Sequence, residues 1–170
     1  MMPMLAAGLI YPVKRPDQHT RRFTTRGSMA RVRVIGTSVA AIQAAEHELG
    51  RKLPLSFSDW LLVNNGRALG ALTIFPVFDA RDPRKTWESI VRHFKEGWQA
   101  WLSNFSDTAQ DFSTLLPFAE CGTGDYYCFD YAVLGKAGEP IIVLWSHETG
   151  ETTQQVDNFG AFLTMSERIG

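Results

Sequence analysis

The sequence predicts an α+β fold in which helices flank an antiparallel sheet within a single domain. Two observations lead to this prediction. Segments with apolar residues at helical spacing occupy the first half, and short apolar segments separated by glycine-containing turns occupy the second. The chain has 170 residues, 45% hydrophobic and 12% aromatic, which suits one domain with a substantial core.

Two helices are expected first. Gly36–Ser38 offers an N-cap for one, Gly50 ends it, and the second begins near Ser56 and ends at Asn64–Gly66. The expected apolar faces consist of Val39, Ile42, Ala45 and Leu49 in the first helix and Phe57, Trp60 and Leu61 in the second. Glu46 lies on the first apolar face, so its carboxylate is expected to pair with a backbone amide or an arginine.

A strand and a long helix are expected next. Leu72–Phe75 has the composition of a strand, and Pro76 ends it. Asp82-Pro83 suits a helix start, and apolar side chains at spacings of three and four predict a helix from Arg84 to about Trp101. Gly97 weakens or bends this helix.

The second half predicts antiparallel strands and a closing helix. The expected strands are Leu115–Glu120, Tyr126–Tyr131, Pro140–Ser146 and Glu151–Val156. Pro140–Ser146 is continuously apolar, so both of its faces are expected to be covered. Asp157 or Asn158 is expected to cap the last helix, which carries Phe159 and Phe162.

Charge divides the chain into two parts. Residues 1–36 hold seven Lys and Arg against one Asp, a net charge of +6, and the rest holds 10 basic and 17 acidic residues, a net charge of −7. We therefore expect a flexible basic extension over 1–36 and a domain over 37–170. A start at Met29, a transit peptide and a nucleic-acid-binding arm remain alternatives for the extension.

The cysteine count and the absence of long apolar runs predict a cytoplasmic protein without a membrane span. Cys121 and Cys128 are expected to be free thiols in small core positions, with a redox pair as the alternative.

No catalytic or cofactor motif is apparent. The four histidines lack the spacing of metal ligands, Gly122-Thr123-Gly124 lacks the residues of a phosphate loop, and no nucleophile elbow is present. We therefore expect no enzyme, no cofactor and no metal. A site assembled from distant acids such as Asp125 and Glu148 remains an alternative.

Several short motifs together resemble the SUKH superfamily, which includes the Smi/Knr regulators of fungi and many bacterial immunity proteins. The motifs are Glu46…Leu49-Gly50, Leu53-Pro54, Phe57…Trp60-Leu61, Asn64-Asn65-Gly66, Leu116–Ala119, Gly124–Asp130, Val143–Glu148 and Phe159…Phe162-Leu163. The resemblance covers about 37–165. Arg67 replaces a second glycine that is common in the family, the segment Trp87–Trp101 is unusually rich in tryptophan, and the extension has no counterpart.

The resemblance implies an α+β fold and, in bacteria, neutralisation of a cognate toxin, commonly a nuclease or a deaminase that acts on nucleic acid. It brings no catalytic residues. A regulatory scaffold or interaction domain without a toxin is the alternative. Independently, an acidic body suits contact with a basic, nucleic-acid-binding toxin and does not suit direct binding of nucleic acid.

Acidic residues near predicted helix starts and hairpin ends, together with one tyrosine, are the expected partner-binding residues. They are Asp79, Asp82, Glu88, Glu120, Asp125, Tyr127, Glu148 and Glu151. Four of them also have a structural alternative, whereas Glu120, Glu148 and Glu151 are expected to face solvent at hairpin ends. The first three could stabilise a helix start, and Asp125, like Asp130 outside this set, could accept hydrogen bonds from backbone amides.

Overall fold

The structure is a computed structural model that describes residues 36–168. The predicted basic extension therefore lies outside the described residues, except for Gly36. The helices are α1 (Val39–Leu49), α2 (Leu55–Asn64), α3 (Pro83–Thr86), α4 (Ile90–Lys95), α5 (Gly97–Leu102), a 3-10 turn (Ser103–Phe105) and α6 (Phe159–Glu167). The strands are β1 (Thr73–Ile74), β2 (Leu115–Glu120), β3 (Tyr126–Leu134), β4 (Pro140–Trp145) and β5 (Thr152–Val156).

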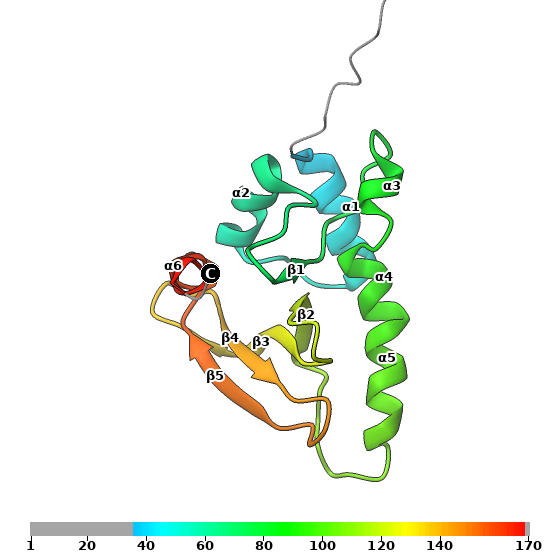
Figure 1. Cartoon of the computed structure of the whole chain (residues 1–170), viewed down its shortest axis with the longest axis vertical. Coiled ribbons are helices and arrows are strands. Elements are labelled where there is room, and N and C mark those ends of the chain that lie inside the picture. The colour runs from blue at the N-terminus through cyan, green and yellow to red at the C-terminus, as the bar shows by residue number, and fades with distance from the viewer. Residues whose placement is uncertain (1–35, 169–170) are drawn as a thin grey trace, which may run out of the picture. The chain divides into compact units, whose positions relative to one another are not determined.

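The strands form one sheet in the order β1-β2-β3-β4-β5, and every neighbouring pair is antiparallel (Figure 1). Phe129 of β3 pairs with Leu116 of β2 on one side and with Ile142 of β4 on the other. The four longer strands match the predicted segments closely, and the α+β prediction is confirmed. None of the helices within residues 36–168 combines the length and apolar character needed to cross a membrane.

Helices α2 and α6 cover one face of the sheet. Phe57 of α2 lies 5.3 Å from Phe129 of β3 and 4.8 Å from Phe159 of α6, measured between ring centroids. Phe118 of β2 stacks on Phe129 at 4.2 Å. These four rings are fully buried and fix how the two helices sit on the sheet.

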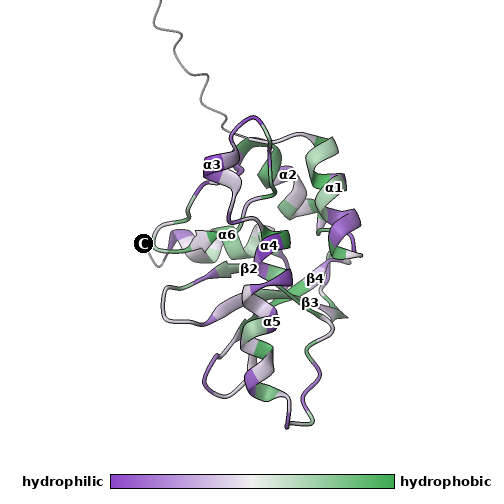
Figure 2. Ribbon diagram, turned by 90° about the vertical axis from the view of Figure 1, so that its right-hand side faces the viewer, coloured by the Kyte–Doolittle hydropathy of each residue, from purple (hydrophilic) through white to green (hydrophobic). Residues whose placement is uncertain are grey.

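Helix α5 covers the other face. Successive side chains of a strand point to opposite faces, so Tyr126 and Cys128 lie opposite to Tyr127 and Phe129. The ring of Trp98 in α5 lies 6.0 Å from Tyr126 and 4.8 Å from Trp145. Figure 2 shows the apolar colouring of β3 and β4, which lie between the two helical layers. The expectation that both faces of β4 are covered is confirmed.

Helix α1 begins and ends where the sequence predicts. The side-chain oxygen of Ser38 accepts a hydrogen bond from the backbone N–H of Ala41, and Gly50 ends the helix with a φ of 68°. Ile42, Ala45 and Leu49 are buried as expected. Val39 is 58% exposed, so its place on the apolar face was predicted wrongly. It stands in the first turn, before the helix reaches the core.

The long helix predicted from Arg84 to Trp101 is wrong, because three short helices replace it. Between α3 and α4 the chain leaves the helix, and the hydroxyl of Ser89 caps α4 by accepting a hydrogen bond from the N–H of Arg92. Glu96 has φ −109° and ψ −75°, which separates α4 from α5. Figure 1 shows α4 and α5 end to end, so the apolar spacing spans the break.

Candidate partner-binding surfaces

Two turns meet at one end of the sheet. Tyr126 at the start of β3 pairs with Trp145 at the end of β4, so the β2–β3 turn and the β4–β5 turn lie side by side. The Oδ1 atom of Asp125 accepts a hydrogen bond from the backbone N–H of His147 (3.1 Å) and lies 2.8 Å from its Nδ1 atom. The hydrogen bond from His147 lowers the pKa of Asp125. Asp125 therefore joins the two turns, and its role here is structural.

Gly124 allows this close approach. Its φ is 100°, which disfavours other residues, and a Cβ atom at this position would lie only 3.0 Å from the imidazole ring of His147. The same ring packs in a T-shaped arrangement with Trp101 of α5, with centroids 5.3 Å apart. The turns are thus fixed to each other and to α5.

Three predicted acids surround these turns: Glu120, Glu148 and Glu151, called here the hairpin-end acids. Glu148 and Glu151 are exposed and Glu120 is half-buried. Among the described residues, no ion pair neutralises any of the three. They present uncompensated negative charge on one rigid end of the sheet.

Tyr127, one of the predicted partner-binding residues, is buried. The side chain is 9% exposed and packs edge-on against Phe162 of α6, with ring centroids 4.9 Å apart. The alternation of β3 directs it to the face covered by α6. Burial also raises its pKa.

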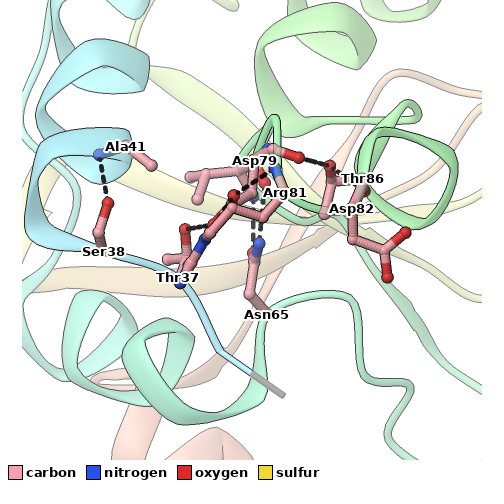
Figure 3. Close-up of polar contacts among 9 residues, drawn as sticks. Thr37, Ser38, Ala41, Asn65, Asp79, Arg81, Asp82 and Thr86 are labelled. Atoms are coloured by element: carbon pink, nitrogen blue, oxygen red, sulfur yellow. Dashed lines mark hydrogen bonds and ion pairs between the residues drawn. The ribbon is translucent and has the colours of Figure 1, made fainter. Parts of the chain in front are cut away.

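Asp79, another predicted partner-binding residue, is also buried, at 5% exposure. Figure 3 shows its carboxylate between Arg81 and Thr37. Arg81 donates to both carboxylate oxygens, at 2.9 and 2.6 Å, and the hydroxyl of Thr37 donates at 2.9 Å. The hydrogen bonds from Arg81 hold the pKa of Asp79 well below its usual range. Asp79 therefore links the loop before α3 to Thr37, which precedes α1.

Asp82 has the structural role that the sequence left open. Its carboxylate accepts from the backbone N–H of Lys85 (3.4 Å) and caps α3. The hydroxyl of Thr86 donates to the carbonyl of Asp82 (2.9 Å) and accepts from the N–H of Asp79 (3.0 Å). Thr86 is buried, so the loop from Val77 to Asp82 is held firmly against α3.

A groove of about 400 Å³ lies between α1 and α4, beside this loop. It is lined by Ala41, Ala44 and Ala45 of α1 and by the aromatic side chains of Phe78 and Trp87. Phe78 is 44% exposed and Trp87 is 57% exposed, and they are the exposed aromatic side chains among the large apolar ones within residues 36–168. The guanidinium of Arg92 lies 4.8 Å from the centre of the Trp87 ring.

Charged side chains border this groove. Lys95 of α4 pairs with Glu48 of α1 at 2.8 Å, and Arg92 pairs with Glu96 at 3.1 Å. Glu88, a predicted interface residue, is exposed and lies 3.9 Å from Arg92. Sequence reasoning missed this groove. The sequence feature that could have indicated the groove is Trp87, a tryptophan that precedes the apolar residues of the predicted long helix and does not belong to their pattern.

Both cysteines within the described residues are free thiols, and Cys128 is fully buried as predicted. Within residues 36–168, no group of three or more His, Cys, Asp and Glu side chains is arranged to hold a metal ion.

Glu46 accepts a hydrogen bond from the backbone N–H of Leu53 at 3.0 Å, as expected, and its ion-pair partner is Lys52 instead of an arginine.

Comparison with known proteins identifies the family. The SMI1 / KNR4 family, also called SUKH-1, matches residues 36–165, which is most of the chain and nearly all of its described part. A comparison with curated proteins gave no match. The matched range begins just before α1 and ends within α6, so it includes the whole sheet and both surfaces described above. The chain belongs to the SMI1 / KNR4 (SUKH-1) family.

Proposed function

We propose that this protein is an immunity protein that binds a cognate bacterial toxin and occludes its active cleft. The toxin would be a nuclease or a nucleic-acid deaminase, neutralised in the cytoplasm of the producing cell or its kin. Membership of the SMI1 / KNR4 family supports binding of proteins as the general role. The observation that carries the proposal is the group of unneutralised hairpin-end acids on one rigid end of the sheet.

The physical argument concerns charge. An enzyme that acts on nucleic acid presents basic side chains to the phosphates of its substrate. Carboxylates held on a rigid turn can occupy the positions of these phosphates and accept the same hydrogen bonds. The net charge of −7 outside the basic extension also speeds the encounter with a basic protein. Under this proposal the protein acts by binding alone and has no catalytic residue.

The test is charge reversal at the hairpin end. The double variant Glu148→Lys, Glu151→Lys is compared with Asp59→Lys, Glu167→Lys, in which two exposed acids elsewhere change by the same total charge. The assay takes as its candidate toxin the C-terminal domain of a large secreted protein, where one is encoded beside the gene of this chain. Loss of charge pairs at an interface costs about 2–5 kcal/mol, so the first variant is expected to bind tens to thousands of times more weakly.

Cells that express the toxin domain should survive with the wild type and the control variant, and should not survive with the hairpin-end variant. Both variants should keep the thermal midpoint of the wild type, because exposed charges contribute little to stability. Equal protection by the two variants would exclude the hairpin end as the interface. A wild-type chain that neither binds the toxin domain nor protects the cells would instead favour a regulatory scaffold, which the same family membership accommodates.

A further inference from the structure

A concave surface adjoins the hairpin-end acids. A pocket of about 440 Å³ lies between the loop that joins α5 to β2 and the start of β5. Figure 1 shows this loop passing beside the β4–β5 turn, and the Nε2 atom of Gln110 donates to the carbonyl of Thr149 in that turn (3.4 Å). Glu151, one of the hairpin-end acids, lines the pocket, so the pocket continues the surface that is proposed to bind the partner.

The charged side chains that line this pocket are all acidic. They are Asp111, Asp130 and Glu151, and the pocket is called here the acidic pocket. Among residues 36–168, no ion pair neutralises any of the three, and no basic side chain lines the pocket. The groove between α1 and α4 differs, because Arg92 and Lys95 line it and pair with its glutamates. The potential in the acidic pocket is therefore negative and favours a cation.

Backbone groups orient two of the three carboxylates. The Oδ1 atom of Asp111 accepts from the N–H of Ser113 (2.9 Å), and the Oδ1 atom of Asp130 accepts from the N–H of Ala132 (3.0 Å). The hydrogen bond from Ser113 lowers the pKa of Asp111, so this carboxyl group stays charged. Within the described part of the chain, the Oδ2 atoms of Asp111 and Asp130 accept no hydrogen bond. They remain available to the donors of a bound cation.

Phe112 gives the acidic pocket an aromatic wall. Its half-buried ring packs against Trp145, with centroids 6.2 Å apart, and against Phe105, with centroids 5.7 Å apart, so it is held in place. A guanidinium group is planar, stacks on aromatic rings and carries five N–H donors that reach several acceptors at once. An ammonium group is a compact point charge and lacks the planar face. An aromatic wall beside several carboxylates therefore suits arginine better than lysine.

We propose that the acidic pocket binds an arginine side chain of the protein partner, whose guanidinium lies against the Phe112 ring and donates to the surrounding carboxylates. The proposal rests on the proposed function in taking the partner to be the basic protein that meets the hairpin-end acids. It goes further by naming the partner side chain and by adding two acids, Asp111 and Asp130, to the contact.

The test uses the full chain labelled with ¹⁵N and two blocked tripeptides, Gly-Arg-Gly and Gly-citrulline-Gly. Citrulline has the shape of arginine without its charge. In two-dimensional NMR spectra, the arginine peptide should move the backbone signals of Phe112, Gly150 and Thr152, which line the pocket, with a Kd in the millimolar range. The citrulline peptide should bind at least about tenfold more weakly, and added salt should weaken binding of the arginine peptide.

Two further comparisons identify the occupant. A Gly-Lys-Gly peptide should bind more weakly than the arginine peptide, because it supplies the charge without the planar group. The wild-type signals should not move when the protein is concentrated without peptide. Movement of the same signals on concentration would assign the pocket to a second copy of this chain and would overturn the proposal, as would binding of the lysine peptide as tight as that of the arginine peptide.

Two pocket variants and a matched control locate the binding. Asp111→Asn and Asp130→Asn each remove one charge but keep an oxygen that can accept from the backbone, so their thermal midpoints should stay close to that of the wild type. Asp107→Asn changes an exposed acid of the same loop that does not line the pocket. Each pocket variant should bind the arginine peptide about fivefold more weakly, whereas Asp107→Asn should bind it as the wild type does. Equal binding of the arginine and citrulline peptides, or equal affinity in Asp130→Asn and Asp107→Asn, would refute the proposal.

The outcome is separable from that of the proposed function. If the arginine peptide binds in the acidic pocket but the wild-type chain does not neutralise the candidate toxin, the pocket binds arginine as proposed and the immunity role fails. If the wild type neutralises the toxin, and Asp111→Asn and Asp130→Asn bind the toxin domain with wild-type affinity, the pocket proposal fails alone.

Discussion

The side chain of Asn65 pairs with the backbone of Val77 through two hydrogen bonds, each 2.9 Å long. Its Oδ1 atom accepts from the N–H of Val77, and its Nδ2 atom donates to the carbonyl of Val77. Both residues are buried. Asn65 directly follows α2, and Val77 lies in the loop before α3. The side-chain amide of Asn65 therefore satisfies both backbone hydrogen-bonding groups of Val77, as a neighbouring strand would in a sheet.

The first prediction is that Asn65→Ala is strongly destabilising. It leaves the N–H and the carbonyl of Val77 without partners in a buried position, and each such group costs about 1–3 kcal/mol. We expect the free energy of unfolding, measured by urea denaturation, to fall by about 2–4 kcal/mol. The matched control is Asn104→Ala at an exposed asparagine, which should change it by less than about 0.5 kcal/mol. A similar effect of the two substitutions would show that the Asn65 pairing contributes nothing.

The second prediction concerns the cap of α2, which is provided by a residue 83 positions further along the sequence. Pro54 precedes α2 and offers no capping side chain. Glu139, in the turn before β4, accepts from the N–H of Ser56 at 2.8 Å and from its hydroxyl at 2.6 Å. Its carboxylate also faces the positive end of the helix dipole. Glu139→Ala should therefore lower the free energy of unfolding by about 1–2 kcal/mol.

Glu139→Gln separates the charge from the hydrogen bonds. It keeps one acceptor oxygen and removes the charge, so its unfolding free energy should lie between those of the wild type and Glu139→Ala. The nearby exposed Lys136→Ala provides the control and should leave the denaturation midpoint unchanged. If Glu139→Ala unfolds at the wild-type midpoint, the contact does not stabilise α2.

These two contacts show why the sequence predicts the elements better than their connections. Helix α1 carries its own cap in Ser38, and four strands carry their own apolar pattern, so local rules find them. The partners of Asn65 and Glu139 lie 12 and 83 residues away in the sequence. No local rule links residues at such distances. The break between α4 and α5 was predicted only as a weak point or bend at Gly97, because apolar spacing continues through it.

The same contrast between local patterns and contacts over long sequence distances applies to the candidate site residues. Glu148 and Glu151 are exposed as expected because turn residues between strands face solvent. Asp79 is buried by partners from two other segments, Thr37 and Thr86, which the sequence does not place beside it. The groove between α1 and α4 exists only once these helices are packed, so its residues share no motif.

The third prediction distinguishes a buried hydrogen bond from a surface ion pair on the same residue. Glu46 accepts from the backbone N–H of Leu53 and pairs with Lys52, whose side chain is 81% exposed. Lys52→Ala should change the free energy of unfolding by less than about 1 kcal/mol, since exposed ion pairs contribute little. Glu46→Ala leaves the N–H of Leu53 without its partner and should cost about 1–3 kcal/mol. Equal losses in the two variants would assign the effect to the ion pair.

The fourth prediction follows from the low pKa of Asp79. A carboxyl group whose pKa is lower in the folded than in the unfolded chain adds stability above its unfolded pKa of about 3.9, and this stability is lost as pH falls below that value. The thermal midpoint should therefore fall steeply from about pH 4.5 to about pH 2.5. Because Arg81 is the main cause of the shift, Arg81→Ala should make this decline shallower. The exposed neighbour Arg84→Ala should reproduce the wild-type curve.

The fifth prediction concerns His93 and a higher pH range. Its imidazole ring stacks on Phe75, with centroids 3.7 Å apart and an angle of 6° between the ring planes. Burial lowers the pKa of His93, while Glu120 and Glu88 partly oppose this shift and Arg92 adds to it. The neutral ring is therefore favoured in the folded chain, whereas the unfolded chain binds a proton as pH falls through about 6.5.

Stability should consequently be full above about pH 7.5 and decline as pH falls below about 6.5, before the decline caused by Asp79 begins. His93→Gln lacks the titrating group, so its thermal midpoint should be lower than that of the wild type at about pH 7.5 but should change less between about pH 7.5 and about pH 5. His47→Gln, at an exposed histidine of α1, is the matched control and should keep the wild-type slope. If His93→Gln shows the same slope as His47→Gln, protonation of His93 does not control stability in this range, and the decline must come from another group.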